Sequence, residues 1–211
     1  ARNLLQTQGR DGLYTNTLFR FGDSMRPLLD QGLELGRSFI QPRYQCKHSL
    51  DYLWSGIGAF VSRYPRFRYL FGPASISPLY GKEAISRIAY FYGTHYNGAG
   101  LEIEARTPFV IPANYVEQFG REFDGCDREQ DFRALRDSLA ENGLPVPVLF
   151  KHYAQATEPD GVNFVAFNTD PQFGDCVDAF VMADLEKLKP KKRRRYLVDG
   201  APAAPDSRVA D

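Results

Sequence analysis

The chain has 211 residues, of which 43% are hydrophobic and 25% are charged, and its 26 basic and 26 acidic residues cancel. This length and composition predict a single domain over residues 1–200, followed by a disordered, Ala- and Pro-rich tail over 201–211. The zero net charge argues against a nucleic-acid partner. Cys46, Cys126 and Cys176 form no CxxC pair. With no apolar run long enough to span a bilayer, we expect a cytoplasmic protein with reduced thiols and no metal site.

The first thirty residues are predicted to form a layer that covers a sheet. Residues 3–8 favour a short helix, ended by a polar turn with glycine. Residues 13–21 mix aromatic and β-branched side chains, which favours an extended stretch. Residues 23–29 are predicted to form a helical turn capped by Asp23.

An acid and a base interrupt the next predicted strand, residues 32–40. Glu34 and Arg37 lie in an otherwise apolar run, and a buried charge needs a partner or a ligand to offset its desolvation. Residues three apart point to opposite faces of a regular strand, but a bulge at Gly36 would bring both side chains to one face. We therefore expect Glu34 and Arg37 to share a face near the open end of the sheet.

A loop and a helix follow this strand and return the chain to the sheet. The loop, residues 41–47, carries Arg43 and Lys47 but no glycine. The helix is predicted to begin at an N-capping Ser49, since apolar side chains recur after it at helical spacing. Residues 67–73 predict a second strand, stopped by the Gly-Pro pair at its end. Because a βαβ connection joins parallel neighbours, the two strands should pair in parallel.

Hydroxyl groups follow the second predicted strand. Ser75, Ser77 and Tyr80 come soon after its carboxyl end, where ligands tend to bind in open α/β sheets. Short hydroxyl side chains also cap helices at such positions, so a structural role stays open for them.

The remaining elements follow from apolar spacing. Helical spacing predicts three helices, over residues 82–95, 127–140 and 146–156. Two further strands are predicted over residues 161–167 and 176–182. The polar turn between these strands, residues 168–175, begins with Asn168. Asp170 and Asp175 in this turn, with Asp178 just beyond it, can face an ammonium group, although Asp and Asn are also ordinary turn formers.

A run of cations surrounds Pro190 near the end of the domain. This basic run consists of Lys189, Lys191, Lys192, Arg193, Arg194 and Arg195. It can be a solvated helix end, a nucleic-acid patch or an electrostatic membrane anchor, and the zero net charge disfavours the second. Each cation near an anionic surface contributes about 1 kcal/mol, enough in combination for reversible membrane binding.

Four motifs occur in a recognisable order: ELGRS at residues 34–38, the helix from Ser49, LFGPASIS at 70–77 and FVAFNTDPQF at 164–173. In this order they resemble the GNAT-type N-acyltransferases that make ornithine lipids and related acyl-amino-acid lipids, a group often named haemolysins. The resemblance runs, with gaps, over residues 12–197. The Glu-x-x-Arg pair is also similar to one in the acyl-homoserine lactone synthases.

The resemblance implies an α/β fold with a GNAT-like mixed sheet and flanking helices, lacking its first strands in this chain. It implies transfer of a long fatty acyl chain from acyl carrier protein to the α-amine of an amino acid, with ornithine as the expected acceptor. Glu34 would be the base or would hold the ammonium group, and Arg37 would pair with it or bind the acceptor carboxylate. Tyr80 would protonate the leaving thiolate.

The resemblance also implies binding roles. Acceptor binding is expected from Ser75, Ser77, Asn168 and Asp170. Acyl-CoA-dependent GNAT enzymes cradle a pyrophosphate in a Gly-rich loop, which residues 41–47 lack. We therefore expect acyl carrier protein as donor, contacted by Arg43 and Lys47, and no bound cofactor. A role of Arg43 and Lys47 as two solvated surface cations stays open. Because the implied lipid product must reach a bilayer, we expect the basic run to bind an anionic membrane, with the protein peripheral at the inner membrane face.

Two rival functions remain at this stage. One is an acyl transfer like that of the autoinducer synthases. The other is a noncatalytic, haemolysin-like membrane-binding module, in which Glu34 and Arg37 form a structural ion pair. Lysophospholipid acyl transfer is disfavoured, because no histidine is followed by the aspartate of a His-x-x-x-x-Asp motif.

Overall fold

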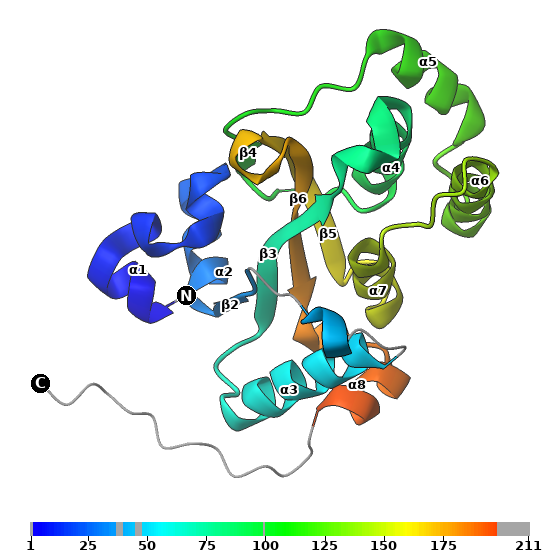
Figure 1. Ribbon diagram of the computed structural model, residues 1–211. Helices are drawn as coiled ribbons and strands as arrows, with labels where there is room; N and C mark the ends of the chain where they lie inside the picture. The colour runs from blue at the N-terminus through cyan, green and yellow to red at the C-terminus, as the bar shows by residue number, and fades with distance from the viewer. Residues whose placement is uncertain (1, 37–39, 45–47, 99, 198–211) are drawn as a thin grey trace, which may run out of the picture.

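The computed structural model describes residues 2–36, 40–44, 48–98 and 100–197. A four-stranded sheet in the order β2-β3-β6-β5 lies at its centre, and a smaller sheet of β1 and β4 lies beside it (Figure 1). The strands are β1 Phe19–Phe21, β2 Gly32–Glu34, β3 Tyr69–Ile76, β4 Ile103–Ala105, β5 Val162–Asp170 and β6 Cys176–Asp184. β2 and β3 pair in parallel, and the other pairs are antiparallel. The predicted mixed sheet, its parallel pair and both late strands are confirmed.

An N-terminal layer covers one face of the central sheet. It contains α1 Arg2–Gln8, α2 Arg26–Asp30 and the smaller sheet (Figure 1). Phe19 of β1 packs edge-on against Phe180 of β6 with ring centroids 5.6 Å apart, in an apolar cluster that includes Phe71 of β3. This layer is therefore held by aromatic side chains from both sheets.

Two local predictions in this layer need correction. Of residues 13–21, predicted to be extended, Tyr14–Thr17 form a 3₁₀ helix, because a carboxylate from β2 accepts hydrogen bonds from amides at its start. The predicted helical turn that follows β1 is present, but its N-cap is Gly22 and not Asp23.

Helices cover the other face of the central sheet. They are α3 Ser49–Arg63, α4 Gly81–His95, α5 Ala113–Glu122, α6 Arg128–Glu141, α7 Val148–Ala156 and α8 Pro190–Tyr196. Alternation along β3 separates the two faces, since Leu70, Ala74 and Ile76 pack with the helices and Phe71 packs with the N-terminal layer. The helices predicted for α3, α4, α6 and α7 are confirmed with small shifts of their ends, and α5 was not predicted.

The ends of two helices are held by polar contacts that the sequence did not indicate. His95, at the end of α4, lies 2.7 Å from the Asp131 carboxylate in the first turn of α6, and both side chains are buried. Ser49 was predicted to cap α3, but it is the first helical residue and His48 takes the N-cap position. The Ser49 hydroxyl instead donates a hydrogen bond to the Tyr44 carbonyl.

β2 leaves the sheet earlier than predicted. The strand predicted over residues 32–40 ends at Glu34, and Leu35 adds one bond from its amide to the Phe71 carbonyl at 2.7 Å. Gly72 permits this crossing, because a β-carbon at that position would lie 2.0 Å from the Leu35 carbonyl oxygen. The predicted strand is thus too long at its carboxyl end.

β3 continues where the sequence predicts a stop. It passes through Gly72 and Pro73 to Ile76, so the prediction that the Gly-Pro pair ends this strand is wrong. The Phe71 carbonyl faces β2, and backbone groups two residues apart face the same edge of a strand. Pro73, which has no N–H, therefore lies at the edge that β2 has left, where no ladder bond is lost. The two parallel strands separate at this point.

Some predictions concern residues outside the described ranges. These are the roles of Arg37 and Lys47 and the disordered tail over 201–211. Among the described helices, none is both long and apolar enough to cross a membrane.

Candidate functional site

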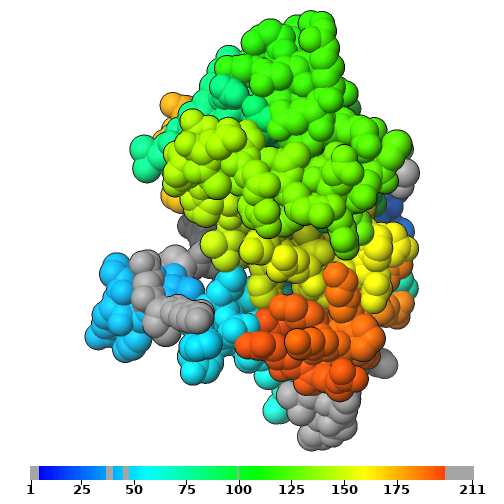
Figure 2. Space-filling model, turned by 90° about the vertical axis from the view of Figure 1, so that its right-hand side faces the viewer, coloured from blue at the N-terminus to red at the C-terminus, as the bar shows by residue number. Residues whose placement is uncertain are grey.

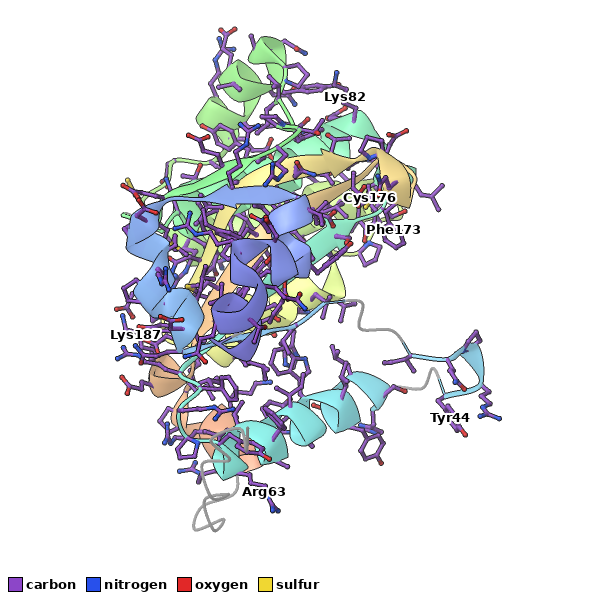
Figure 3. All side chains as sticks on the ribbon, turned by 90° about the vertical axis from the view of Figure 1, so that its left-hand side faces the viewer. Tyr44, Arg63, Lys82, Phe173, Cys176 and Lys187 are labelled. Atoms are coloured by element: carbon purple, nitrogen blue, oxygen red, sulfur yellow. The ribbon has the colours of Figure 1, made fainter. Side chains whose placement is uncertain are left out.

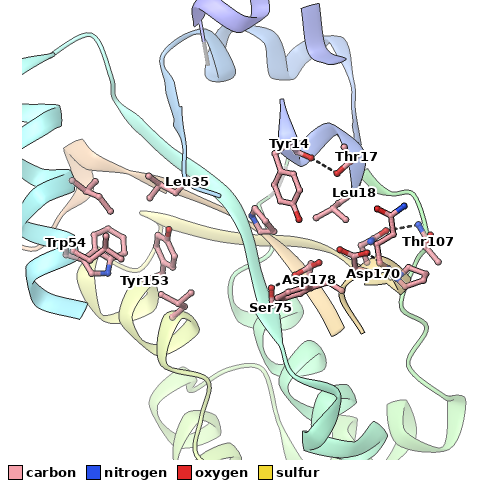
Figure 4. Close-up of a pocket in the computed structure, with 18 residues that line it drawn as sticks. Tyr14, Thr17, Leu18, Leu35, Trp54, Ser75, Thr107, Tyr153, Asp170 and Asp178 are labelled. Carbon is pink, nitrogen blue, oxygen red and sulfur yellow. Dashed lines mark hydrogen bonds between the residues drawn. The ribbon is translucent and has the colours of Figure 1, made fainter. Parts of the chain in front are cut away.

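A cavity of about 1040 Å³ opens where β2 and β3 separate. Figure 4 shows its lining side chains on both sides of β3. The walls are formed by Tyr14, Thr17, Leu18, Leu35, Leu53, Trp54, Ile57, Pro73, Ser75, Thr107, Leu149, Tyr153, Asn168, Asp170, Pro171, Gln172, Phe173 and Asp178. These residues divide into an apolar end between α3 and α7 and a polar end over β3, β5 and β6.

The apolar end is built by helical spacing. Leu53, Trp54 and Ile57 project from one side of α3 into the cavity, as side chains three and four apart do. Trp54 packs edge-on against Tyr153 of α7, with ring centroids 5.1 Å apart. Burial raises the pKa of Tyr153, so its phenol stays neutral. Leu35, whose amide bonds to Phe71 of β3, closes the end nearest the split (Figure 4).

The polar end is organised by a row of side chains across three strands. Ser75, Asp178 and Asn168 lie directly opposite one another in the ladders of β3, β6 and β5, and opposed residues share a face of the sheet. We call these three side chains the polar row. The Ser75 hydroxyl donates a hydrogen bond to Asp178 Oδ1 at 2.5 Å. Ser75 itself is exposed, whereas Asp178 is only 2% exposed.

A bulge in β5 puts the row in register. The ladder shifts between Val165 and Phe167, and Ala166 has a φ of 57° in the left-handed region. Without the extra residue, Phe167 and not Asn168 would oppose Asp178. A non-glycine residue in this conformation costs on the order of 1–3 kcal/mol, and such strain tends to gather at functional sites.

Acidic groups surround the polar row. Burial, together with the nearby Asp170, raises the pKa of Asp178, although the Ser75 hydrogen bond opposes the rise. Asp170 is 7% exposed and accepts a hydrogen bond from the Gln172 amide at 2.9 Å. Burial and the two carboxylates raise the pKa of the Cys176 thiol to about 12. Cys176 is therefore a neutral thiol and not a nucleophile at neutral pH.

Three predicted binding residues, Ser75, Asn168 and Asp170, line the cavity. Asn168 Oδ1 accepts a hydrogen bond from the Thr107 amide at 2.7 Å, and its Nδ2 donates to the Thr169 carbonyl at 3.0 Å. Asn168 thus holds the segment that precedes α5 against β5. Phe173, 66% exposed, lies near Cys176 at the same end of the sheet (Figure 3) and forms part of the rim.

Glu34 lies outside the cavity wall. Its Oε1 accepts hydrogen bonds from the Thr15 amide at 2.7 Å and the Thr15 hydroxyl at 2.8 Å, and its Oε2 accepts one from the Tyr14 amide at 3.3 Å. The carboxylate therefore fastens β2 to the N-terminal layer, which explains an acid in this apolar strand. Its predicted role as a base stays a prediction, as does any partnership with Arg37.

The structure does not bring three other predicted site residues into the cavity. The Ser77 hydroxyl caps the Pro78–Tyr80 turn by accepting from the Leu79 amide at 3.3 Å. Tyr80, whose pKa burial raises, donates to the Pro145 carbonyl at 2.9 Å. Arg43 is exposed and lies over the Tyr44 ring at 4.6 Å. Their catalytic and binding roles remain predictions.

The basic run forms the short helix α8, which docks on α3. Figure 2 shows α8 beside α3 and α7 on one face of the protein. Asp51 of α3 binds both Arg195, at 2.7 Å, and the Tyr196 hydroxyl, at 2.7 Å. Gly58 allows close approach, because a β-carbon there would lie 1.9 Å from the Tyr196 carbonyl oxygen. Lys191, Arg193 and Arg194 stay exposed.

Several cavity residues escaped sequence reasoning. Trp54 and Tyr153 fall on apolar helix positions, and spacing does not separate a cavity wall from a core. Asp178 was not missed, since it was expected beside Asp170 and Asp175; it lines the cavity, whereas Asp175 is not among the lining residues. Among the residues described, no group of three or more His, Cys, Asp or Glu side chains is placed to hold a metal ion.

Comparison with known proteins supports the GNAT part of the resemblance seen in the motifs. A family model described as an acetyltransferase (GNAT) domain matches residues 1–55, and the mixed sheet with flanking helices is consistent with a GNAT-like fold. The similarity points to an N-acyltransferase of the GNAT type.

Two curated relatives, both named glycine N(alpha)-acyltransferase, are similar to this chain. The protein from Bacteroides thetaiotaomicron is 26% identical over 203 residues, covering 92% of this chain and 59% of the relative. The protein from Phocaeicola vulgatus is 25% identical over 197 residues, covering 90% of this chain and 60% of the relative. The chain thus spans about three fifths of the length of these relatives. No solved structure matches the chain significantly.

Proposed function

We propose that this chain carries the acyl-transfer site of an N-acyltransferase that moves a long fatty acyl chain from a carrier-protein thioester to the α-amine of an amino acid. The observation that carries the proposal is one continuous cavity with an apolar end and an acidic end, which meet where β2 and β3 separate. Such a cavity suits two substrates that differ in polarity. The GNAT match and the names of the two relatives support the same reaction class.

The apolar end is suited to the acyl chain. Each buried methylene contributes about 0.8 kcal/mol, so a chain laid along Leu53, Trp54 and Tyr153 is held chiefly by the hydrophobic effect. Among the described residues that line this end, none carries a charged side chain. The thioester then lies at the split, beside Leu35 and Pro73.

The acidic end is suited to the amine. Asp170 and Asp178 attract an ammonium group, and Ser75 offers an exposed hydroxyl beside them. Backbone groups two residues apart face the same edge of a strand. Because Pro73 lies at the edge of β3 that β2 has left, the Ser75 amide lies at that edge as well. An amide in this position can donate to the carbonyl oxygen as negative charge develops on it during attack.

The proposal also specifies which donor and which acceptor the enzyme uses. Acyl carrier protein is the favoured donor, because residues 41–44 offer no glycine for a pyrophosphate and Arg43 is exposed to an acidic partner. The amino acid is ornithine by the motif resemblance and glycine by the relatives' names, so both belong in the same assay. Exposed cations on α8 support a peripheral position at an anionic inner membrane face.

The experiment is acyl transfer followed by mass spectrometry of the product, with long-chain and short-chain acyl carrier protein and either amino acid. Leu53→Trp fills the apolar end and should lower kcat/KM for the long chain by about 15-fold, the equivalent of about two lost methylenes. The short-chain donor should be little affected. Ser55→Trp, on an exposed part of the same helix, is the matched control.

Two outcomes would count against the proposal. Equal losses for both chain lengths in Leu53→Trp would remove the acyl chain from this end of the cavity. Thioester cleavage that yields free fatty acid and no amide would replace N-acyl transfer by hydrolysis.

A further inference from the structure

We propose that Ser75 is a catalytic residue that relays the proton of the attacking amine to Asp178. This inference rests on the proposed function and assigns the base within it. The geometry that carries it is the 2.5 Å hydrogen bond from an exposed hydroxyl in the cavity to a carboxylate that is only 2% exposed. Ser75 reaches the substrate, and Asp178 acts through it.

Asp178 is free to accept a proton, whereas Glu34 is already engaged. The Glu34 carboxylate accepts three hydrogen bonds from Tyr14 and Thr15 and does not line the cavity. Among the described residues, the Asp178 carboxylate accepts only from Ser75 and from the Cys176 sulfur, which lies 3.9 Å from each carboxylate oxygen. A thiol is a weak donor, so the second oxygen of Asp178 retains its capacity to accept.

The relay balances over one turnover. The neutral amine attacks the thioester carbonyl carbon, and a C–N bond forms as the carbonyl π electrons move to oxygen. The nitrogen then gives one proton to Ser75 Oγ while Ser75 gives its own proton to Asp178. As the C–S bond breaks, the thiolate takes this proton back along the same path. The products are an amide and a thiol, and Ser75 and Asp178 regain their starting states.

The surroundings of Asp178 suit a base that works near neutral pH. Asp170 and Cys176 are the titratable groups that face it from β5 and β6, Ser75 faces it from β3, and Tyr14 lines the same cavity from the N-terminal layer. Burial and Asp170 raise the pKa of Asp178 above its ordinary range. A base is most effective when its pKa lies nearer the operating pH.

The test is the pH dependence of kcat/KM for wild type, Ser75→Ala and Asp178→Asn, with the amide product as readout. Wild type should show an acid limb from the Asp178 carboxyl and a second, higher limb from the acceptor's own ammonium group. Each variant should lose about 100-fold at the optimum, within the usual range for general base catalysis. Asp178→Asn should also lose the acid limb and keep the higher one.

Two controls separate chemistry from folding. Asp184→Asn removes a buried carboxylate from the same strand, where it pairs with Arg68 at 2.7 Å. It should lower stability and leave the pH profile unchanged. The double variant of Ser75 and Asp178 should be no slower than Asp178→Asn alone, because residues that act as one unit are not additive.

The results of these experiments would show whether the relay alone fails or whether the proposed acyl transfer fails as well. An active wild type whose acid limb survives in Asp178→Asn and disappears in Glu34→Gln would overturn the relay and leave the acyl transfer intact. Full activity in Ser75→Ala would do the same. A wild type that forms no amide would overturn both.

Discussion

The stacked pair of Trp54 and His152 allows a quantitative test of how the apolar end of the cavity is built. The rings lie 4.7 Å apart at an angle of 22°, and the buried His152 Nε2 has no hydrogen-bond partner among the described residues. Burial lowers the pKa of His152 from 6.5 to about 4. The positive charges of Lys192 and Arg195 lower this pKa further, and the negative charge of Asp51 opposes the change. The folded protein therefore resists protonation of this ring.

The sign of the effect on stability follows from this depressed pKa. Between pH 6.5 and about 4 the unfolded chain binds a proton at His152 that the folded chain does not, so the free energy of unfolding falls as the pH falls through this window. At about 1.36 kcal/mol per pH unit the ceiling is about 3.4 kcal/mol. His152 is only partly buried, so solvent screening reduces the expected loss to about 1–2 kcal/mol.

The assay compares urea unfolding of wild type and His152→Phe at pH 7.5 and pH 4.5. Phenylalanine keeps a ring against Trp54, cannot take a proton and loses no hydrogen bond that Nε2 makes with the described residues. The stability difference between the two proteins should shift by about 1–2 kcal/mol in favour of the variant at the lower pH. Trp54 is the single tryptophan of the chain, so its emission follows the transition locally. His48→Phe, at an exposed position, is the control.

A pH-independent difference between wild type and His152→Phe would refute the reasoning. It would mean that the ring is solvated enough to be protonated in the folded state. The wall of the apolar end would then be less closely packed than the structure indicates.

Three further predictions concern the surface around α3. Gly58→Ala should destabilise the protein by about 1–3 kcal/mol in urea unfolding, because its methyl group meets the α8 backbone. The control Gly56→Ala has open space around it and should stabilise the protein by about 0.5–1 kcal/mol. Equal effects of the two variants would contradict the docking of α8. Purified protein should prefer acyl carrier protein over acyl-CoA, and Arg43→Glu should raise KM for the carrier more at low salt than at high salt; comparable kcat/KM for the two donors would reject this. Binding to liposomes should rise with anionic lipid, fall with salt and vanish when the basic run is changed to Gln; equal binding to neutral vesicles would indicate apolar insertion instead.

The fold was predictable wherever one local signal decided an element. Helical spacing in α3, α4, α6 and α7 and the apolar runs of β5 and β6 each led to the observed element. The βαβ rule led to the parallel pair, because its connection is short at both ends. These predictions depend on neighbours in sequence, which a single chain displays.

The separation of β2 from β3 was not predictable in this way. The Gly-Pro pair at positions 72 and 73 normally ends a strand, but here an adjacent strand has already departed, so Pro73 loses no partner. That departure depends on the close approach of the Leu35 carbonyl to Gly72, a contact between residues far apart in sequence. The cavity opens beside this contact, which sequence spacing does not reveal.

The candidate site was predicted only in part, because it too depends on contacts between residues far apart in sequence. Ser75, Asn168 and Asp170 line the cavity as expected, although Asn168 and Asp170 are the end of strand β5 and not part of the turn predicted from residue 168. Asp178 becomes central only through the bulge at Ala166 and its partner Ser75 on another strand. Glu34 drew attention as an acid in an apolar strand, and its carboxylate proved to bind backbone amides of the N-terminal layer.

The most direct test of the account is a crystal structure with an N-acyl amino acid product bound. The account predicts that the acyl chain lies between α3 and α7 against Trp54 and Tyr153, that the amide lies at the split between β2 and β3, and that its nitrogen is within hydrogen-bonding distance of Ser75 Oγ. A product whose chain leaves the apolar end empty, or whose amide lies beside Glu34 and away from Ser75, would contradict it.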